Sequence, residues 1–180
     1  MRIQIGRLVL ERQQKIDNKN KNKIKIKVMG LDMYLSKKTY VRQWDHQSPE
    51  EKYEVVVTKG GKPVDGIKAS RVKYIEEEVG YWRKANQIHR WFVENVQDGV
   101  DDCRDAYVNR EDLETLLDIC KKVDTDHSLA ESLLPAASGF FFGGTDYDEW
   151  YYNDIQNTIK ILEEALAEDS SSDFYYSSSW

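Results

Sequence analysis

The sequence predicts an α+β domain in which three to four helices pack on one face of a small antiparallel sheet. Apolar residues alternate with other residues at Leu31, Met33 and Leu35, which is typical of a strand with one buried face. The second half is dominated by apolar residues at helical spacing, and β-prone aromatic residues return at 174–180. Strands before and after a helical middle favour the α+β class.

The chain divides into a basic start and an acidic body. Residues 1–28 contain nine Lys/Arg and two Asp/Glu, a net charge of +7. Because the whole chain carries −6, residues 29–180 carry −13. We expect residues 1–28 to be a partly disordered basic extension and residues 29–180 to form a single domain.

The charge of the body limits the partners that it suits. Direct nucleic-acid binding needs cations that displace counterions, and only residues 1–28 offer a surplus of them. An acidic body suits a partner with a basic surface, although it is also typical of a surface that only maintains solubility. Cys103 and Cys120 are too few for a disulfide framework, so we expect a reducing host cytoplasm. The sequence has no apolar run of about 18 residues, so no membrane span is expected.

Three strands are predicted before the helical middle. The first covers residues 30–35, has a bulge near 36–38 and continues over 39–44. Residues 53–58 have the strongest strand pattern, and Gly60 and Gly61 follow in a turn. Residues 71–77 favour a third strand, which Gly80 separates from a helix.

A central helix is predicted within residues 79–102. Its core-facing stripe consists of Tyr81, Ala85, Ile88, Phe92 and Val96. Beside that stripe, Trp82, Asn86 and His89 are expected at the edge of the core, where an indole, an amide and an imidazole would be presented together.

Two longer helices and a final strand complete the prediction. Asn109 is a good N-cap, and it precedes an apolar stripe at Leu113, Leu116, Leu117, Cys120 and Val123. Asp126 starts a short helix that ends at Pro135, and residues 138–145 are strand-like. Thr145 or Asp146 caps the last helix, with its stripe at Tyr151, Ile155, Ile159, Leu162 and Leu166. The aromatic residues within 174–180 favour an additional strand.

Acidic residues near His89 suggest one kind of chemistry. His89 with Asp101 and Asp102 is the candidate catalytic group, and Asp98, Asp146 and Asp148 are the candidate metal ligands. Carboxylates that bind Mg²⁺ or Mn²⁺ beside an imidazole suit phosphodiester cleavage. Their spacing matches no ligand motif, and carboxylates at helix starts also serve as caps.

Aromatic and polar side chains suggest a binding site instead. The candidates are Trp82, Arg83, Asn86, His89, Tyr147 and Trp150. An exposed ring stacks on a nucleobase and an arginine meets a phosphate, as a pocket for a nucleotide signal requires. Large aromatic residues equally fill a small core or form a homodimer contact.

Several segments together resemble a known protein family. They are MGLDMYL (29–35), GYWRKANQIH (80–89), Trp91-Phe92, FFFG (140–143), TDYDE (145–149) and the tyrosine-rich end at Trp180. This set resembles a widespread family of small uncharacterised phage and prophage proteins, over residues 29–180. The resemblance implies an accessory protein of a mobile element, for which defence evasion is a common task.

These observations predict a cofactor-free protein that binds and inhibits a host defence component. The resemblance and the acidic body suggest, as first target, a CRISPR-Cas effector or its guide RNA complex, since such effectors hold nucleic acid in a basic channel. One alternative is an RNA nuclease dependent on Mg²⁺ or Mn²⁺. The other is a sponge that binds a nucleotide immune signal.

Overall fold

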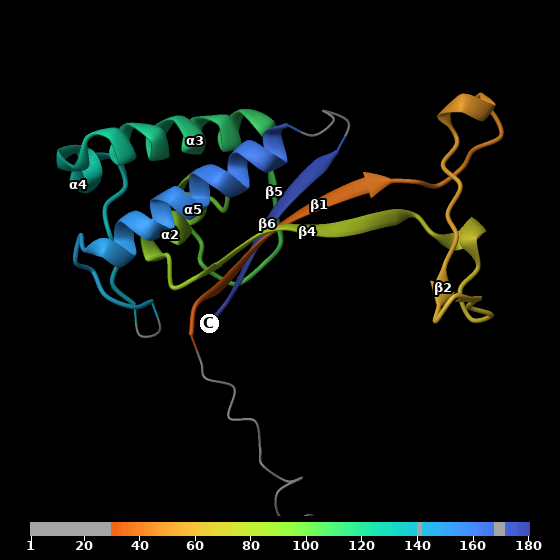
Figure 1. Cartoon of the computed structure of the whole chain (residues 1–180), viewed down its shortest axis with the longest axis horizontal. Coiled ribbons are helices and arrows are strands. Elements are labelled where there is room, and N and C mark those ends of the chain that lie inside the picture. The colour runs from red at the N-terminus through yellow and green to blue at the C-terminus, as the bar shows by residue number, and fades with distance from the viewer. Residues whose placement is uncertain (1–29, 140–141, 168–171) are drawn as a thin grey trace, which may run out of the picture.

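A four-stranded antiparallel sheet supports the structure, and the computed structural model describes residues 30–139, 142–167 and 172–180. The strand order is β4-β1-β6-β5, with β1 at Asp32–Tyr40, β4 at Tyr74–Arg83, β5 at Ala106–Val108 and β6 at Asp173–Ser179. The helices in these residues are α2 (Asn86–Asn95), α3 (Arg110–Thr125), α4 (Ala130–Leu133) and α5 (Glu149–Leu166). They gather on one face of the sheet (Figure 1). The predicted α+β fold is therefore confirmed.

The strand β1 lies inside the sheet and pairs with β4 and β6. Its pairing with β4 shifts register between Leu35 and Ser36, at the start of the segment predicted to bulge. The final strand is also confirmed, because β6 pairs with β1 on one side and β5 on the other. The end of the chain is thus held in the middle of the sheet.

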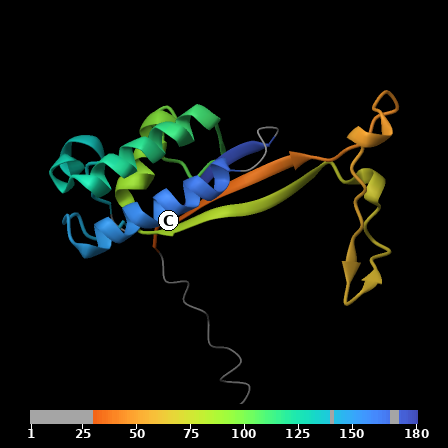
Figure 2. The ribbon, with the colours of Figure 1, turned by 45° about the horizontal axis from the view of Figure 1, so that its top comes forward.

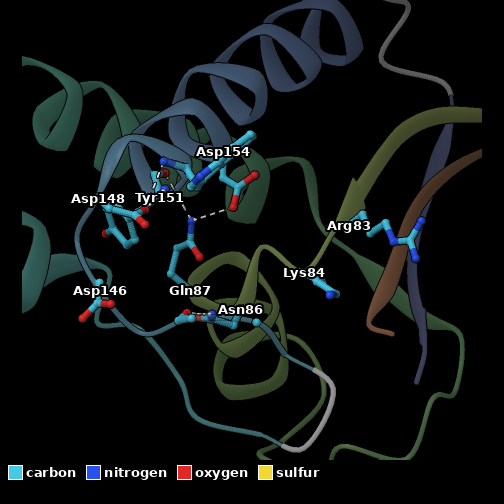
Figure 3. Close-up of a pocket in the computed structure, with 11 residues that line it drawn as sticks. Arg83, Lys84, Asn86, Gln87, Asp146, Asp148, Tyr151 and Asp154 are labelled. Carbon is cyan, nitrogen blue, oxygen red and sulfur yellow. Dashed lines mark hydrogen bonds between the residues drawn. The ribbon is translucent and has the colours of Figure 1, made fainter. Parts of the chain in front are cut away.

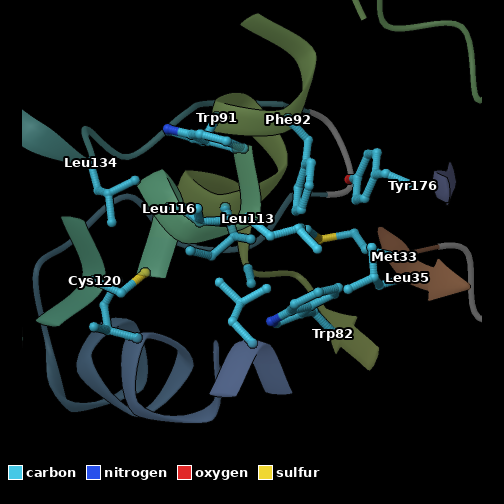
Figure 4. Packing of buried hydrophobic residues seen from close by; sticks show 14 of the residues in the cluster. Met33, Leu35, Trp82, Trp91, Phe92, Leu113, Leu116, Cys120, Leu134 and Tyr176 are labelled. Carbon is cyan, nitrogen blue, oxygen red and sulfur yellow. The ribbon is translucent and has the colours of Figure 1, made fainter. Parts of the chain in front are cut away.

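Side chains from the sheet and the helices form one hydrophobic core (Figure 4). The stripes of α3 and α5 point into it as predicted, with Leu113, Leu116, Ile155 and Leu162 fully buried. The rings of Phe92 on α2 and Tyr176 on β6 stack with centroids 4.0 Å apart. Gly80 permits a close approach between β4 and α5, because a Cβ there would lie 2.6 Å from Cγ2 of Ile161.

The predicted start of the central helix is wrong. The strand β4 continues to Arg83 and contains Gly80, and α2 begins only at Asn86. Residues 81–83 alternate between exposed and buried, as in a strand, so Tyr81 is 41% exposed instead of facing the core. Its hydroxyl donates to Asp32 (2.6 Å), and this hydrogen bond, with burial, raises the pKa of Tyr81 to about 12.

Three local predictions also need correction. Within 53–58 only Thr58 lies in a strand, the two-residue β2 (Thr58–Lys59) that pairs with β3 (Lys62–Pro63). Residues 138, 139 and 142–145 form no strand, and Phe140 and Phe141 lie outside the described residues. The cap of α5 is Asp148, whose carboxylate accepts hydrogen bonds from the backbone of the first turn.

The segment 41–73 forms an arm that projects from the end of β1 and β4 (Figures 1 and 2). It contains the hairpin β2–β3 and two short 3-10 helices, Pro49–Glu51 and Ala69–Arg71. No residue from 42 to 73 is buried. The rest of the described chain, residues 30–40, 74–139, 142–167 and 172–180, is called the lobe below. Within the described residues no helix is long and apolar enough to cross a membrane.

Candidate functional site

A pocket of about 340 Å³ opens where β4 ends, α2 begins and the start of α5 approaches (Figure 3). We call it the junction pocket. The β4–α2 connection contributes Arg83, Lys84, Asn86 and Gln87. The segment leading into α5 contributes Gly143, Gly144, Asp146 and Asp148, and α5 itself adds Trp150, Tyr151 and Asp154.

A tight turn shapes one wall of this pocket. Lys84 adopts a left-handed backbone conformation (φ 62°), which side-chain-bearing residues rarely use. Its N–H donates to the carbonyl of Leu31 (2.8 Å), and its own carbonyl accepts from Asn86 N–H (2.8 Å). Gly143, with φ 88°, passes so close that a Cβ there would lie 3.3 Å from Cβ of Lys84. The turn and the glycine segment therefore fit against each other only with this backbone geometry.

Asn86 holds the segment that leads into α5. Its side chain is 3% exposed and donates to the carbonyls of Phe142 (3.1 Å) and Gly144 (2.7 Å). Its amide oxygen accepts from the backbone N–H of Ala137 (2.9 Å). The predicted binding residue thus positions a wall of the pocket, because its hydrogen bonds connect α2 to both sides of residues 138–141.

Gln87 and Asp154 present acceptor atoms inside the pocket. Gln87 is 2% exposed, and its Nε2 donates to the carbonyl of Tyr151 (3.4 Å) and to Oδ2 of Asp154 (3.5 Å). Its Oε1 has no hydrogen-bond partner in the described part of the chain. Burial raises the pKa of Asp154 to about 6, and the long hydrogen bond from Gln87 only partly opposes this. Both groups therefore lack a good donor.

The start of α5 adds negative charge and an exposed ring. One carboxylate oxygen of Asp148 accepts from the N–H groups of Trp150 (3.0 Å) and Tyr151 (3.1 Å). The indole of Trp150 is 77% exposed, the most exposed of the large apolar side chains in the described residues. Asp146 is exposed at the same mouth. Carboxylates and a free aromatic face together suit a cationic group.

The cations of the pocket lie away from these acceptors. Figure 3 shows Gln87 pointing toward Tyr151 and Asp154, whereas Arg83 points to the opposite side. The guanidinium of Arg83 lies 3.9 Å from Asp32 on the neighbouring strand. The pocket therefore has an acceptor-rich side and a separate cationic rim formed by Arg83 and Lys84.

His89 meets one of its predicted carboxylates, but inside the protein. Its Nε2 lies 3.0 Å from Oδ2 of Asp101, and its Nδ1 lies 2.7 Å from the hydroxyl of Tyr176. The other oxygen of Asp101 accepts from the indole of Trp180 (3.1 Å). Because His89 is 1% exposed and Tyr176 is fully buried, this chain of contacts connects α2, the following loop and β6. It leaves no opening for a substrate at the imidazole.

The remaining candidates are not brought together. Asp102 pairs with Arg104, as does the exposed Asp98. Among the described residues no three His, Cys, Asp or Glu side chains lie close enough to hold a metal ion. Asp146 and Asp148 lie in the junction pocket without an imidazole, since His89 is not among its lining residues.

Two of the aromatic candidates make contacts within the protein and do not line the junction pocket. Trp82 is 2% exposed and donates its indole N–H to Thr158 (2.9 Å), so the expectation that it lies at the edge of the core is wrong. The Tyr147 ring packs 4.9 Å from that of Tyr151, and Tyr147 does not line the pocket. Trp150 alone of the predicted aromatic binders is open to a ligand there.

Sequence reasoning missed Lys84, Gln87 and Asp154. Lys84 directly follows a strand and precedes a helix, where a turn conformation is common, but nothing local indicates a left-handed backbone. Gln87 and Asp154 are neighbours only because α2 and α5 pack together. The sequence contained one signal for Asp154. It follows Tyr151 by three residues and precedes Thr158 by four, which places it on the same side of α5 as these residues.

Comparison with known proteins adds no assignment. The chain matches no protein-family model, no curated protein and no solved structure.

Proposed function

We propose that this protein is a binding protein that docks a cationic side chain of a basic partner in the junction pocket. The observation that carries the proposal is the acceptor-rich side of the pocket. There Oε1 of Gln87 has no partner within the described residues although the residue as a whole is only 2% exposed, and Asp154 is partly desolvated without a cation. A guanidinium or ammonium group would donate to both.

Trp150 completes the recognition that we propose. Its exposed indole lies at the mouth of the same pocket, and an arginine stacks favourably on such a ring while its donors meet carboxylates. Asp146 and Asp148 add negative charge at the entrance. The acidic lobe would also speed the approach of a basic partner.

The partner that we propose is a host defence component, and its binding would inhibit it. The first candidate is a CRISPR-Cas effector or its guide RNA complex, because the resemblance to phage proteins implies that context and such effectors have basic channels. This proposal requires no cofactor.

Co-elution with purified effectors at about 50 mM and about 500 mM NaCl tests the proposal. We expect a complex at low salt that high salt weakens. Trp150→Ala should weaken binding about five- to thirtyfold, the loss of about 1–2 kcal/mol of cation–π energy. The double variant Asp146→Asn/Asp154→Asn should weaken it further.

Matched variants outside the pocket serve as controls. Tyr107→Ala removes an exposed aromatic ring from β5, and Asp118→Asn/Glu131→Gln removes two exposed carboxylates from α3 and α4. These variants should bind as the unmodified protein does. Absence of a complex across a panel of effectors, or equal losses in pocket and control variants, would contradict the proposal.

The cationic rim favours a second candidate, a sponge for a nucleotide immune signal. Arg83 and Lys84 line the same pocket as Trp150, so a phosphate and a stacked base would each find a suitable group. A bound cyclic nucleotide at about 100 times its Kd would raise the unfolding midpoint by about 5–10 °C. Trp150→Ala should abolish that shift.

The metal-dependent RNA nuclease stays a prediction. Incubation of the protein with labelled RNA and Mg²⁺ or Mn²⁺ tests it directly. Cleavage that His89→Ala removes would support the predicted catalytic group, whereas intact RNA favours the binding proposals.

A further inference from the structure

The arm differs from the lobe in the partners of its cations. Residues 58–73 contain one carboxylate, Asp65, and five cations, a net charge of +4; the cations are Lys59, Lys62, Lys68, Arg71 and Lys73. None of these cations forms an ion pair within the described residues. All five residues are exposed. The ammonium of Lys73 lies over the ring of Tyr74 at 5.8 Å, and the other four charges are free to meet an outside anion.

Most cations of the lobe are held by carboxylates instead, with Lys84 and Lys160 as the exceptions within the described residues. Lys37 lies 2.8 Å from Glu77, Lys121 lies 2.7 Å from Glu163, and Lys122 lies 2.6 Å from Asp118. Residues 74–180 contain eight Lys/Arg and 24 Asp/Glu, a net charge of −16. Residues 74–180 would thus repel a polyanion that the cations of 58–73 attract.

Geometry separates that place from the acidic surface. The arm projects beyond the end of β1 and β4, away from the helices (Figures 1 and 2). Charges further apart than about 8 Å are largely screened at physiological ionic strength. The acidic surface around the helices therefore contributes little to the potential around the hairpin.

A second pocket lies beside these cations. It has a volume of about 440 Å³, and its lining residues include Trp44, Tyr53, Ala69 and Val72, together with Lys52 and the carboxylates Asp45 and Glu54. Since residues 69–72 also carry Arg71, the pocket and the cationic surface share one segment of chain. The volume is within the range of small-molecule sites.

The pocket has an aromatic side chain ready for a flat ligand. Tyr53 is 49% exposed, and its ring contacts no other aromatic ring or cation in the described residues. Trp44 differs, because Arg42 lies over its ring at 4.5 Å. Exposed rings beside unpaired cations are the combination by which proteins hold single-stranded nucleic acid, with bases on rings and phosphates on cations.

We propose that the arm binds single-stranded nucleic acid, with phosphates on its unpaired lysine and arginine side chains and a base against Tyr53. This contact is independent of the junction pocket. From the sequence alone, only the basic residues 1–28 were expected to contact nucleic acid. The arm would be a second such contact. A partner that contains both a basic protein surface and RNA would engage the pocket and the arm together.

Fluorescence anisotropy with a labelled 20-nucleotide RNA of mixed sequence tests the proposal on the full chain. The arm variant is Lys68→Glu/Arg71→Glu, and its control is Lys122→Glu/Lys160→Glu, which changes the net charge equally on α3 and α5. The arm variant should bind at least about tenfold more weakly. The slope of the logarithm of its association constant against the logarithm of salt concentration should be shallower by about 1.4, because two phosphate contacts are lost.

The control variant should retain the affinity within about twofold. Equal weakening in both variants would show a general charge effect and overturn the proposal. Unchanged binding by the arm variant would also overturn it, since residues 1–28 would then account for the contact. Thermal unfolding checks that both variants fold. We expect the arm variant to fold because no residue from 42 to 73 is buried.

Tyr53→Ala separates a nucleic acid from other anions. It should weaken single-stranded RNA binding about tenfold and leave binding to vesicles that contain phosphatidylserine unchanged. Equal affinity of the unmodified protein for such vesicles and for RNA, with no effect of Tyr53→Ala on either, would identify a general anion surface and overturn the proposal.

Discussion

The arm and the lobe of this protein differ in where their side chains find partners. In the lobe, His89, Asn86 and Trp82 are each less than 4% exposed and satisfied by hydrogen bonds within the protein. In the arm, residues 42–73 include no buried side chain, and the cations of 58–73 have no carboxylate beside them. These three polar residues of the lobe therefore maintain the fold, whereas the cations of 58–73 in the arm are available for binding.

A histidine substitution in each region tests this contrast most strongly. His89→Leu removes both hydrogen bonds of the imidazole and leaves the hydroxyl of Tyr176 buried without a partner. We expect the free energy of unfolding to fall by about 3 kcal/mol. His46→Leu, at an exposed site in the arm, should change it by less than about 0.5 kcal/mol. Chemical denaturation of both variants measures the difference, and similar losses would contradict the contrast.

A glycine substitution in each region should give a smaller difference. The Cβ introduced by Gly80→Ala would lie 2.6 Å from Cγ2 of Ile161, so β4 or α5 must shift. We expect a loss of about 1–3 kcal/mol. A Cβ on Gly66 in the arm meets no atom within 4 Å, so Gly66→Ala should leave stability unchanged or raise it by about 0.5 kcal/mol. If both variants unfold at the same temperature, the structure accommodates a Cβ at position 80 without loss of stability, and the expected contrast is wrong.

The smallest expected effect concerns a carboxylate and depends on pH. Burial raises the pKa of Asp154 from 3.8 to about 6. The folded protein therefore holds this proton more tightly than the unfolded chain does. The stability that it contributes is fully present below about pH 4 and is lost as pH rises through 6. Asp154→Asn keeps this position neutral, so the variant should be the more stable protein at pH 8 and similar to the unmodified protein at pH 4.5.

Asp65→Asn is the matched control in the arm. It also removes one negative charge, from an exposed site, and should show no such pH-dependent gap. Thermal unfolding of both variants at the two pH values makes the measurement. A gap of equal size in the two variants would attribute the effect to net charge instead of burial.

Local pattern was enough for much of the lobe. The apolar stripes of α3 and α5, the caps at Asn109 and Asp126, and the final strand were all predicted from spacing. These features depend on residues within a few positions of one another. The alternation at Leu31, Met33 and Leu35 likewise identified the buried face of β1.

The same kind of pattern failed where local and tertiary preferences differ. Residues 53–58 are rich in valine, but they lie in the arm, where no neighbouring sheet or core is available to pair with them. The positions of Tyr81 and Trp82 in the sequence fit the pattern of a helix as well as that of a strand. Pairing with β1 decided that they belong to β4.

The candidate site was predicted only in part. Sequence reasoning named Arg83, Asn86, Asp146, Asp148 and Trp150, all of which line the junction pocket. It also paired His89 with Asp101, and the two do meet. The burial of His89 and its contact with Tyr176, 87 residues away, were not expected. Spacing along the chain does not show whether other elements will cover a side chain.

The sequence by itself determined the apolar stripes of α3 and α5, the caps at Asn109 and Asp126 and the opposite charges of different regions, because each of these is a property of neighbouring residues. Only the tertiary structure decided that Gln87 faces Asp154, that His89 is enclosed by β6 and that the arm remains uncovered. Those outcomes depend on which surfaces meet when α2, α5 and the sheet pack together. Packing removes water from some polar groups and leaves others exposed, and that difference identifies the sites proposed for binding.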